Sequence, residues 1–375
     1  MNRYLTLDDV EVDGLSVLVR SDLNVPLEGG EIGDDFRIRS ALPTLERLVA
    51  EGADVTVCSH LGRPKGVDPE LSLRPVADRM AELSEYEVGF ETGGDITVLE
   101  NTRVLDGETS NDTAIAEKLA DGFDLFVQDA FGSVHRAHAS TVGVAEILRS
   151  AAGPLLDAEL RALDRLLGET DHPYTVVLGG AKVSDKLGVI ENLLPKVDRM
   201  LIGGGMCFTF LAAQGLDVGD SLVEESMLET VGNLAGDDKI VLPIDVVIGD
   251  RFAEDSQHRV VPVSAIPAGW MGLDIGPETS DEFARNVVDS ASVFWNGPMG
   301  VFEWRPYRGG TEAVAKAMVE CTGFTAVGGG DSVAALRVLD LEDTVSHVST
   351  GGGAGLELLE GKILPGVQVL ERWVK

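Results

Sequence analysis

Short apolar runs rich in valine, leucine and isoleucine recur along the chain, and a turn and a longer amphipathic stretch follow most of them. Continuous apolar runs of this kind are typical of parallel strands that are buried on both faces of a sheet. They predict strands at residues 15–19, 55–58, 97–99, 125–127, 176–178, 200–202, 240–242, 293–295, 324–327 and 345–348. Helical patterns between them include residues 38–51, 73–83, 112–120, 159–167 and 310–320. The alternation predicts βα units and therefore an α/β fold.

One further helix is expected between the two halves of the chain, at residues 155–167 (LLDAELRALDRLL). A length of 375 residues suits two domains, at roughly 150 residues per domain. We therefore expect two Rossmann-like lobes with parallel sheets, at residues 1–152 and 169–363, joined by a helix at 153–168.

The predicted strands of the first half end in charged and hydrogen-bonding side chains. Their sequences are VLVRSDLNVP, VTVCSHLGRP, TVLENTRV and LFVQDAFGSVHRAH. Ligands of parallel sheets bind beyond the carboxyl ends of the strands, so these side chains are expected to share one site. Arginines and histidines gathered there indicate a pocket for a small anion, bound by charge-assisted hydrogen bonds.

The predicted strands of the second half end in glycines instead, in VVLGGAK, MLIGGGM, TAVGGGDS and VSTGGGAG. Glycines at such ends let backbone N–H groups approach a phosphate, or let a flat base lie against the backbone. Any single triplet fits helix–sheet packing as well as ligand binding, and neither GxxxxGK[ST] nor GxGxxG occurs. Four such ends in one half favour a nucleotide site.

Individual side chains sharpen these expectations. Lys182 and Lys186 are four residues apart at a predicted strand–helix junction, which would place both on one face of the first helical turn. Two cations there are unfavourable unless an anion binds between them, so we expect phosphate contact. Asp331 is expected to be a helix N-cap, a magnesium contact, or both. His60 fits a structural role and a ligand role equally well.

Charge is the most unusual feature of the composition. The chain has 63 acidic and 30 basic residues, a net charge of −33, and only nine of its basic residues are lysines. This charge disfavours binding to nucleic acids and to anionic membranes. It resembles the acidic, lysine-poor composition of haloarchaeal proteins and predicts a protein that works in concentrated salt, where screening reduces self-repulsion.

The three cysteines, Cys58, Cys207 and Cys321, lie far apart in sequence, which argues against a disulfide framework or a thiolate zinc site. The first residues lack the apolar core of a signal peptide, and no apolar stretch is long enough to span a bilayer. We therefore expect a soluble, cytoplasmic protein.

Long motifs cover nearly the whole chain. In the first half they are RSDLNVP (20–26), DDFRIRSALPT (34–44), SHLGRPKG (59–66), LENTR (99–103) and DAFGSVHRAHAS (129–140). In the second half they are GGAKVSDK (179–186), IGGGMCFTFL (202–211), GWMGLDIGP (269–277), WNGPMGVFE (295–303), GGGDS (328–332) and HVSTGGGAGLELLEGKILPGV (347–367). In this order they resemble the phosphoglycerate kinase family.

The resemblance implies reversible phosphoryl transfer from 1,3-bisphosphoglycerate to ADP, giving 3-phosphoglycerate and ATP, with Mg²⁺, in a monomer whose lobes close over both ligands. It implies that the first lobe binds 3-phosphoglycerate, that a tail at 364–375 returns to this lobe, and that the second lobe binds the nucleotide. The implied substrate-binding residues are Asp22, Asn24, Arg37, His60, Arg63, Arg103 and Arg136. The implied nucleotide-binding residues are Gly180, Ala181, Lys182, Lys186, Gly204, Asn296, Glu303, Gly329, Gly330, Asp331 and Ser332, with Asp331 near the metal. Arg37 and Lys182 are expected to act on the moving phosphoryl group.

Two other classes of protein remain as alternatives. A nicotinamide-dependent dehydrogenase would suit α/β lobes, but the expected GxGxxG with a later acidic residue is missing. A nucleotide-binding module without catalysis would have little reason to keep the arginine set together with Lys182 and Lys186. An assay of ATP formation from 1,3-bisphosphoglycerate distinguishes all three.

Overall fold

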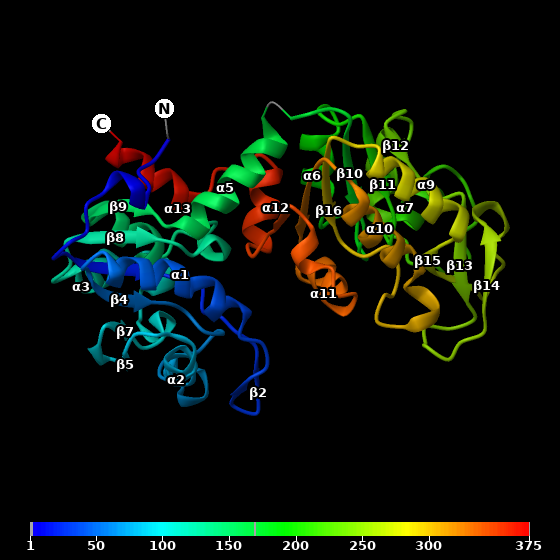
Figure 1. Ribbon diagram of the computed structural model, residues 1–375. Coiled ribbons are helices and arrows are strands. Elements are labelled where there is room, and N and C mark those ends of the chain that lie inside the picture. Colours follow the sequence, from blue (N-terminus) through cyan, green and yellow to red (C-terminus); the bar gives the residue numbers. More distant parts are fainter. Residues whose placement is uncertain (1–2, 169, 375) are drawn as a thin grey trace. The chain divides into compact units, whose positions relative to one another are not determined.

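A computed structural model describes residues 3–168 and 170–374 and divides the chain into two compact units (Figure 1). The first unit comprises Met1–Arg161 and the C-terminal segment Lys362–Lys375, and the second comprises Ala162–Gly361. The division falls inside one helix, α5 (Pro154–Leu167). Each unit has its own parallel sheet, so the α/β fold expected from the sequence is confirmed.

The first unit is built on a seven-stranded sheet in the order β6-β5-β7-β4-β1-β8-β9, in which only the edge strand β6 runs antiparallel to its neighbour. Its strands are β1 (Ser16–Arg20), β4 (Asp54–Cys58), β5 (Val88–Phe90), β6 (Thr92–Gly94), β7 (Ile96–Val98), β8 (Leu125–Gln128) and β9 (Arg149–Ala152). A separate hairpin consists of β2 (Leu27–Glu28) and β3 (Glu31–Ile32). The central strands are buried on both faces, as their apolar sequences require.

The helices of the first unit bury an apolar stripe against this sheet. In α1, for example, Ile38, Leu45 and Leu48 join the core that includes Val17 and Val55. The α-helices are α1 (Phe36–Ala50), α2 (Arg74–Leu83), α3 (Thr113–Ala120), α4 (Val144–Ile147) and α13 (Pro365–Gln368). The 3₁₀-helices are η1 (Leu7–Asp9), η2 (Pro69–Leu71), η3 (Thr102–Val104), η4 (Glu108–Ser110), η5 (Phe131–Ser133) and η11 (Val369–Trp373), and η6 (Ala139–Gly143) is a π-helical turn.

The C-terminal segment packs on the first unit, where α13 and η11 lie beside η6 and β9. The backbone N–H of Gly366 donates to the carbonyl of Val134 (2.9 Å), and the indole N–H of Trp373 donates to the carbonyl of Ala145 (2.9 Å). These bonds join the end of the chain to the segment that follows β8.

The second unit has a six-stranded parallel sheet in the order β12-β11-β10-β16-β17-β18 and a three-stranded antiparallel sheet in the order β14-β13-β15. The parallel strands are β10 (Tyr174–Leu178), β11 (Arg199–Ile202), β12 (Ile240–Val241), β16 (Ser292–Asn296), β17 (Phe324–Gly328) and β18 (His347–Val348). The antiparallel strands are β13 (Asp245–Gly249), β14 (His258–Pro262) and β15 (Met271–Ile275).

Seven α-helices surround these sheets in the described part of the second unit. They are α6 (Leu187–Leu193), α7 (Cys207–Ala213), α8 (Leu228–Leu234), α9 (Pro277–Val288), α10 (Gly309–Glu320), α11 (Gly330–Val338) and α12 (Gly353–Leu359). The 3₁₀-helices are η7 (Glu225–Met227), η8 (Val263–Ala265), η9 (Arg305–Tyr307) and η10 (Glu342–Thr344). Within 3–168 and 170–374, no helix is long and apolar enough to cross a membrane.

The apolar runs predicted the parallel sheets well. Each of the ten runs overlaps a strand of one of the two parallel sheets, and the bounds differ by at most two residues. The antiparallel sheet was not predicted. Its edge strand β14 exposes four of its five residues, so its sequence carries no buried pattern that would have indicated a strand.

Candidate functional site

Basic side chains meet at the carboxyl ends of the strands in the first unit. His60 follows β4 and is 93% buried, and its pKa is held far below its usual value. Burial is the main cause, and the positive charges of Arg20, Arg103 and Arg37, together with His138, add to it. The ring of His60 is therefore neutral, and it lies in a region of concentrated positive charge.

Arg103, in η3, also lies close to several other positive charges. Its pKa is lowered to about 10, first by burial and then by Arg136, Arg20 and Arg63. Cations that lower one another's pKa are held together at a cost, which an anion bound among them would offset. The structure thus brings together the predicted residues Arg37, His60, Arg63, Arg103 and Arg136.

Asp22 and Asn24, which follow β1, hold parts of this cluster in place. Asp22 Oδ1 lies 2.8 Å from Arg37 Nη1 in an ion pair. Asn24 Oδ1 accepts a hydrogen bond from the backbone N–H of Gly62 (2.8 Å), and the carbonyl of Gly62 accepts one from Arg103. Both predicted residues are therefore at the cluster, and in this structure their side chains bond to the protein.

A cavity of about 500 Å³ lies at the glycine-rich strand ends of the second unit. Five predicted residues line it, namely Gly180, Ala181, Gly204, Glu303 and Asp331. The rest of the lining is mostly apolar or glycine and was not predicted: Gly205, Asp220, Leu222, Phe252, Met271, Gly272, Leu273, Pro298, Gly300 and Val301. Such a lining suits a flat aromatic base, with polar groups only at its rim.

Glycines are required here because backbone lies against backbone. The N–H groups of Gly180 and Gly204 donate to the carbonyls of Pro298 (2.9 Å) and Met299 (3.0 Å), which ties together the loops after β10, β11 and β16. Gly204 has a positive φ of 64°, and a Cβ there would lie 2.5 Å from the nitrogen of Gly180. Any other residue would push these loops apart.

Polar side chains gather beside this cavity at the ends of β16 and β17. The ammonium group of Lys186 donates to Asn296 Oδ1, and burial lowers the pKa of Lys186. Asn296 Nδ2 is buried without a hydrogen-bond partner among the described residues, and a Cβ on Gly329 would lie only 2.9 Å from it. Ser332 Oγ accepts a hydrogen bond from the N–H of Gly297 (2.6 Å). An anion bound here would find donors on both Lys186 and Asn296.

The expectation that Lys182 and Lys186 lie on one helical turn is wrong. Helix α6 begins only at Leu187, and both lysines belong to the preceding loop. Glu224 holds this loop, since its carboxylate accepts hydrogen bonds from the N–H (3.0 Å) and the hydroxyl (2.6 Å) of Ser184. Lys182 is exposed and Lys186 is half-buried, so the two differ in environment.

The N-cap interpretation of Asp331 is also wrong. The capping position of α11 is occupied by Gly329, whose φ of 91° only glycine adopts readily, and Gly330 is the first helical residue. Asp331 lies in the first turn, and its side chain lines the cavity.

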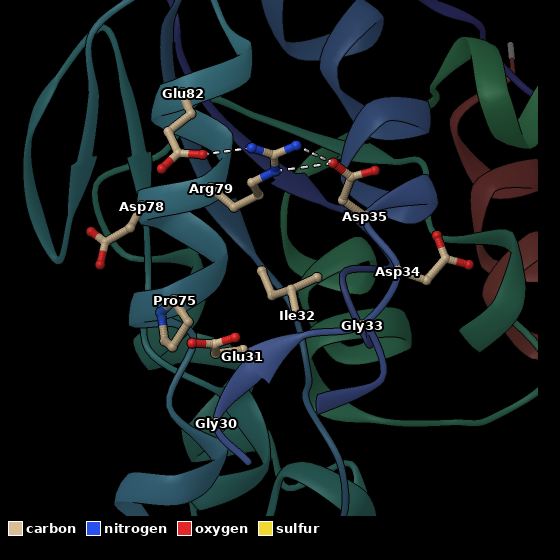
Figure 2. A pocket seen from close by; sticks show the side chains of 10 residues that line it. All are labelled: Gly30, Glu31, Ile32, Gly33, Asp34, Asp35, Pro75, Asp78, Arg79 and Glu82. Carbon is tan, nitrogen blue, oxygen red and sulfur yellow. Dashed lines mark hydrogen bonds and ion pairs between the residues drawn. The ribbon is translucent and has the colours of Figure 1, made fainter. Parts of the chain in front are cut away.

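A second cavity, of about 760 Å³, lies in the first unit between the β2–β3 hairpin, the start of α1 and α2 (Figure 2). Its charged lining is mainly acidic, and Arg79 is ion-paired with Asp35 (2.7 Å) and Glu82 (2.5 Å). No residue predicted for either site lines it. An acidic cavity repels anions, so it is not the predicted anion pocket.

Sequence reasoning gave no role to two buried charged residues of the basic cluster. Arg20 is the last residue of β1 and is fully buried, and Glu108, in η4, is 1% exposed. Arg20 stands first in the motif RSDLNVP, just after the strand predicted at residues 15–19, but it is not among the residues predicted to bind the substrate. The connection of the two through the hydroxyl of Ser140 has no signal in the sequence, because 88 positions separate Arg20 from Glu108.

Comparisons with known proteins agree on one family. The family model described as phosphoglycerate kinase matches residues 7–362. The chain is similar to the phosphoglycerate kinase of Rubrobacter xylanophilus (54% identical, covering 96% of this chain and 97% of the relative) and to that of Salinispora arenicola (55%, covering 98% and 99%). It is similar to the solved structure of phosphoglycerate kinase from Coxiella burnetii (39% identical, TM-score 0.92, covering 99% and 100%). The enzyme from Pyrococcus horikoshii also matches (28% identical, TM-score 0.84, covering 99% and 100%). With a family model that matches most of its length, and relatives that match nearly all of it, the chain belongs to the phosphoglycerate kinase family.

Proposed function

We propose that the basic cluster of the first unit binds 3-phosphoglycerate and that the cavity of the second unit binds ADP or ATP. The chain is a kinase that transfers a phosphoryl group reversibly between 1,3-bisphosphoglycerate and ADP, as its family membership establishes. The assignment of the two sites rests on one observation above all. In a chain of net charge −33, arginines and histidines crowd at one end of one sheet until they lower one another's pKa values.

The three-carbon substrate suits the basic cluster because it carries a phosphate and a carboxylate. Arginine forks bind both groups with charge-assisted hydrogen bonds. We assign Arg63, Arg103 and Arg136 to the phosphate end, and Arg37 and His60 to the region of the carboxylate. Asp22 and Asn24 complete the site by holding Arg37 and the backbone of the loop at Gly62.

The nucleotide suits the cavity because its apolar and glycine walls match a base, while Glu303 offers a carboxylate to the ribose hydroxyls. We assign the phosphates to Lys182, Lys186 and the backbone of the loops that contain Gly180, Ala181 and Gly204. Asn296 and the start of α11, at Gly329, Gly330 and Ser332, complete the phosphate region.

Magnesium would be held by Asp331 together with the nucleotide phosphates. Among the residues that the structure describes, no three His, Cys, Asp or Glu side chains form a metal cluster. A single carboxylate at the cavity fits Mg²⁺, which in kinases is bound by one or two carboxylates and by substrate phosphates. When bound, the ion neutralises charge on the phosphates.

The chemistry requires little beyond alignment and charge. A carboxylate acceptor has a pKa near 4 and is already ionised at neutral pH, so no general base is needed. The remaining task is to hold two anions in line and to stabilise charge on the transferring group. We assign this to Arg37 of the first unit and Lys182 of the second.

Direct transfer brings the acyl phosphate and ADP into contact, so we infer that the two units close over their ligands during the reaction. Small-angle scattering then should give a smaller radius of gyration with 3-phosphoglycerate and nucleotide together than with either ligand alone. An unchanged radius with both ligands bound would contradict closure.

We further infer a halophilic, cytoplasmic monomer that has neither nucleic-acid nor membrane partners. The support is the charge of −33, which repels phosphate-bearing surfaces and is tolerated best in concentrated salt. A sedimentation measurement in molar potassium chloride tests the monomer directly.

Coupled kinetics in high salt test the assignment of the two sites. Arg136→Ala is expected to raise KM for 3-phosphoglycerate and leave KM for ATP unchanged, and Lys186→Ala is expected to do the reverse. Arg161→Ala, at an exposed arginine of α5 paired with Asp157, controls for loss of a surface charge. If Arg136→Ala and Lys186→Ala affected both substrates equally, the division into two sites would be wrong. A chain that binds nucleotide without forming ATP would instead be a non-catalytic module.

A further inference from the structure

A row of buried polar side chains leads from Glu108 to His60 inside the first unit. Glu108 accepts hydrogen bonds from the hydroxyl (2.5 Å) and the backbone N–H (3.0 Å) of Ser140. The hydroxyl oxygen of Ser140 accepts one from Arg20 Nε (3.0 Å), and Arg20 Nη2 lies 3.0 Å from His60 Nδ1. All four side chains are at least nine-tenths buried.

This arrangement determines which nitrogen of His60 carries the proton. A guanidinium group has donors only and stays protonated, so Nδ1 of His60 has to accept the hydrogen bond from Arg20. The ring proton then lies on Nε2. A neutral histidine of this tautomer offers an N–H to a ligand, and so it recognises oxygens that accept hydrogen bonds, such as those of a carboxylate or a phosphate.

Glu108 supplies the negative charge in this row. Arg20 is fully buried, and its remaining bonds go to neutral oxygens, the carbonyl of Ser21 and the hydroxyl of Ser59. A buried cation without a counter-charge is strongly unfavourable, and neighbouring cations would add to the cost. Through Ser140, Glu108 balances the charge and fixes the Nε edge of the guanidinium.

We propose that Glu108 is a positioning residue for His60. It acts through the hydroxyl of Ser140 and the guanidinium of Arg20, and it keeps the N–H of His60 directed at an anionic oxygen of the substrate. The inference rests on the proposed role of the basic cluster in binding 3-phosphoglycerate. The three positioning side chains are too buried to touch the substrate themselves.

The tautomer can be measured on the full-length chain with ¹⁵N-labelled histidine, because ring-nitrogen shifts distinguish a protonated from a bare nitrogen. The signals of His60 are identified by their loss in His60→Gln. We expect a bare Nδ1 and a protonated Nε2, unchanged between about pH 5.5 and 8, without any substrate. In Glu108→Gln and Ser140→Ala, the signals should average between tautomers or begin to titrate. A proton on Nδ1 in the unmodified chain, or unaltered signals in both variants, would overturn the proposal.

Kinetics test the consequence for the substrate. Both variants should raise KM for 3-phosphoglycerate by about 3- to 10-fold, the loss expected for one hydrogen bond, and leave KM for ATP within about twofold. Two matched controls should behave like the unmodified chain. Glu117→Gln removes an exposed carboxylate of α3, and Ser150→Ala removes a buried hydroxyl that bonds to the carbonyl of Leu148.

An altered tautomer with an unchanged KM would show that His60 does not depend on this row to bind the substrate, and would also refute the proposal. If a variant fails to fold, the ring-nitrogen shifts of the unmodified chain still decide the tautomer. If the unmodified chain does not bind 3-phosphoglycerate at all, the proposed site is wrong, while the tautomer result separately tests the row itself.

Discussion

Arg37 combines a fixed position with unused donors. One ion pair to Asp22 holds its side chain, which keeps about a third of its surface exposed. A guanidinium has five N–H donors, so a single carboxylate leaves several of them for a ligand. A cation that is held in place before the reaction stabilises developing charge without having to reorganise. This is the reason to expect a role in transfer rather than in binding alone.

We predict that Arg37→Ala lowers kcat by at least about 10²-fold and changes KM for either substrate by only a few-fold, since comparable arginines contribute roughly 10³–10⁵ in rate. Lys182→Ala should act in the same way, and Arg63→Ala should mainly raise KM for 3-phosphoglycerate. Steady-state kinetics in molar potassium chloride provide the measurement. Arg39→Ala is the matched control, because Arg39 is exposed on the same helix and paired with Asp35. A change in KM alone for Arg37→Ala would show that the residue only binds.

Single residues were predictable where strand ends bring them together. His60, Arg103 and Arg136 come from three separate segments, and the rule that parallel strands share their carboxyl ends was sufficient to group them. Arg37 lies in the helix α1 and was assigned only through the family resemblance. The turn that contains Lys182 was not predictable, because Glu224 stabilises it from 40 positions away. Long-range capping of this kind leaves no local pattern in the sequence.

At the scale of elements, buried aspartates cap two long helices. Asp129 Oδ1 accepts hydrogen bonds from the N–H groups of Leu155 (2.9 Å) and Leu156 (3.1 Å) at the start of α5. Asp274 Oδ2 accepts one from the N–H of Gly310 (2.9 Å) at the start of α10. Burial raises the pKa of Asp129 to about 6 and that of Asp274 to about 8, although the hydrogen bonds act in the opposite direction.

These two carboxyls should make stability fall with pH over different ranges. Both pKa values are raised above 3.8, so the folded chain binds each proton more tightly than the unfolded chain. The tighter proton binding of the folded chain stabilises it fully below about pH 4. This contribution to stability is lost as the pH rises to about 6 for Asp129 and to about 8 for Asp274. Asparagine does not ionise. The Tm of Asp274→Asn minus that of the unmodified chain should therefore increase up to about pH 8, and the difference for Asp129→Asn should level off near pH 6.

Thermal melts at several pH values between about 5 and 9 measure both differences, and each variant serves as the control for the other. Differences that stay constant across this range would contradict the prediction. Equal ranges for the two variants would mean that the pKa values of the two carboxyls do not differ as expected.

The C-terminal segment is a second element with a testable contact. A Cβ on Gly366 would lie 3.0 Å from Val134 Cα and 3.1 Å from Thr141 Cγ2. Backbone at this distance does not give way easily, so Gly366→Ala should push the tail away from the segment that carries Arg136 and His138. We predict a loss of about 1–3 kcal/mol in stability from overpacking, together with a higher KM for 3-phosphoglycerate.

Urea melts and kinetics measure the effect of Gly366→Ala. Gly236→Ala is the matched control, because a Cβ at that glycine meets nothing within 4 Å. A stable variant with an unchanged KM would show that the tail does not hold the anion-binding segment in place.

Strands were most readily predictable where continuous apolar side chains are buried on both faces of a sheet. The strands β1 and β16 are continuous apolar runs because each lies inside a sheet that helices cover. The strand β9 was missed although three of its four residues are buried, because its sequence RSAA contains only small side chains next to an arginine. Its position at the sheet edge depends on pairing with β8, which lies more than 20 residues earlier.

At the scale of the whole molecule, acidic residues outnumber basic residues by 33, so many carboxylates cannot find a basic partner within the chain. Many of the pairs are between exposed side chains, such as Arg251 with Asp255 and Arg74 with Asp78, and contribute little each. Adjacent carboxylates, such as exposed Glu225 beside Glu224 and exposed Asp238 beside Asp237, repel each other at the surface. The sum of these repulsions destabilises the folded state, and its size depends on screening.

We therefore predict that Tm and activity rise as potassium chloride is increased from about 0.2 M to above about 1 M, where the Debye length falls to about 3 Å. Salt also strengthens apolar burial, so a charge variant is needed to separate the two effects. The double variant Glu225→Gln with Asp238→Asn removes two exposed carboxylates and leaves the core unchanged. If repulsion is the cause, its Tm should exceed that of the unmodified chain at low salt, and the two should converge at high salt. If the Tm difference between the double variant and the unmodified chain is the same at every salt concentration, salt does not act by screening charge repulsion. If the Tm of the unmodified chain stays flat or falls as salt is added, the chain is not adapted to concentrated salt.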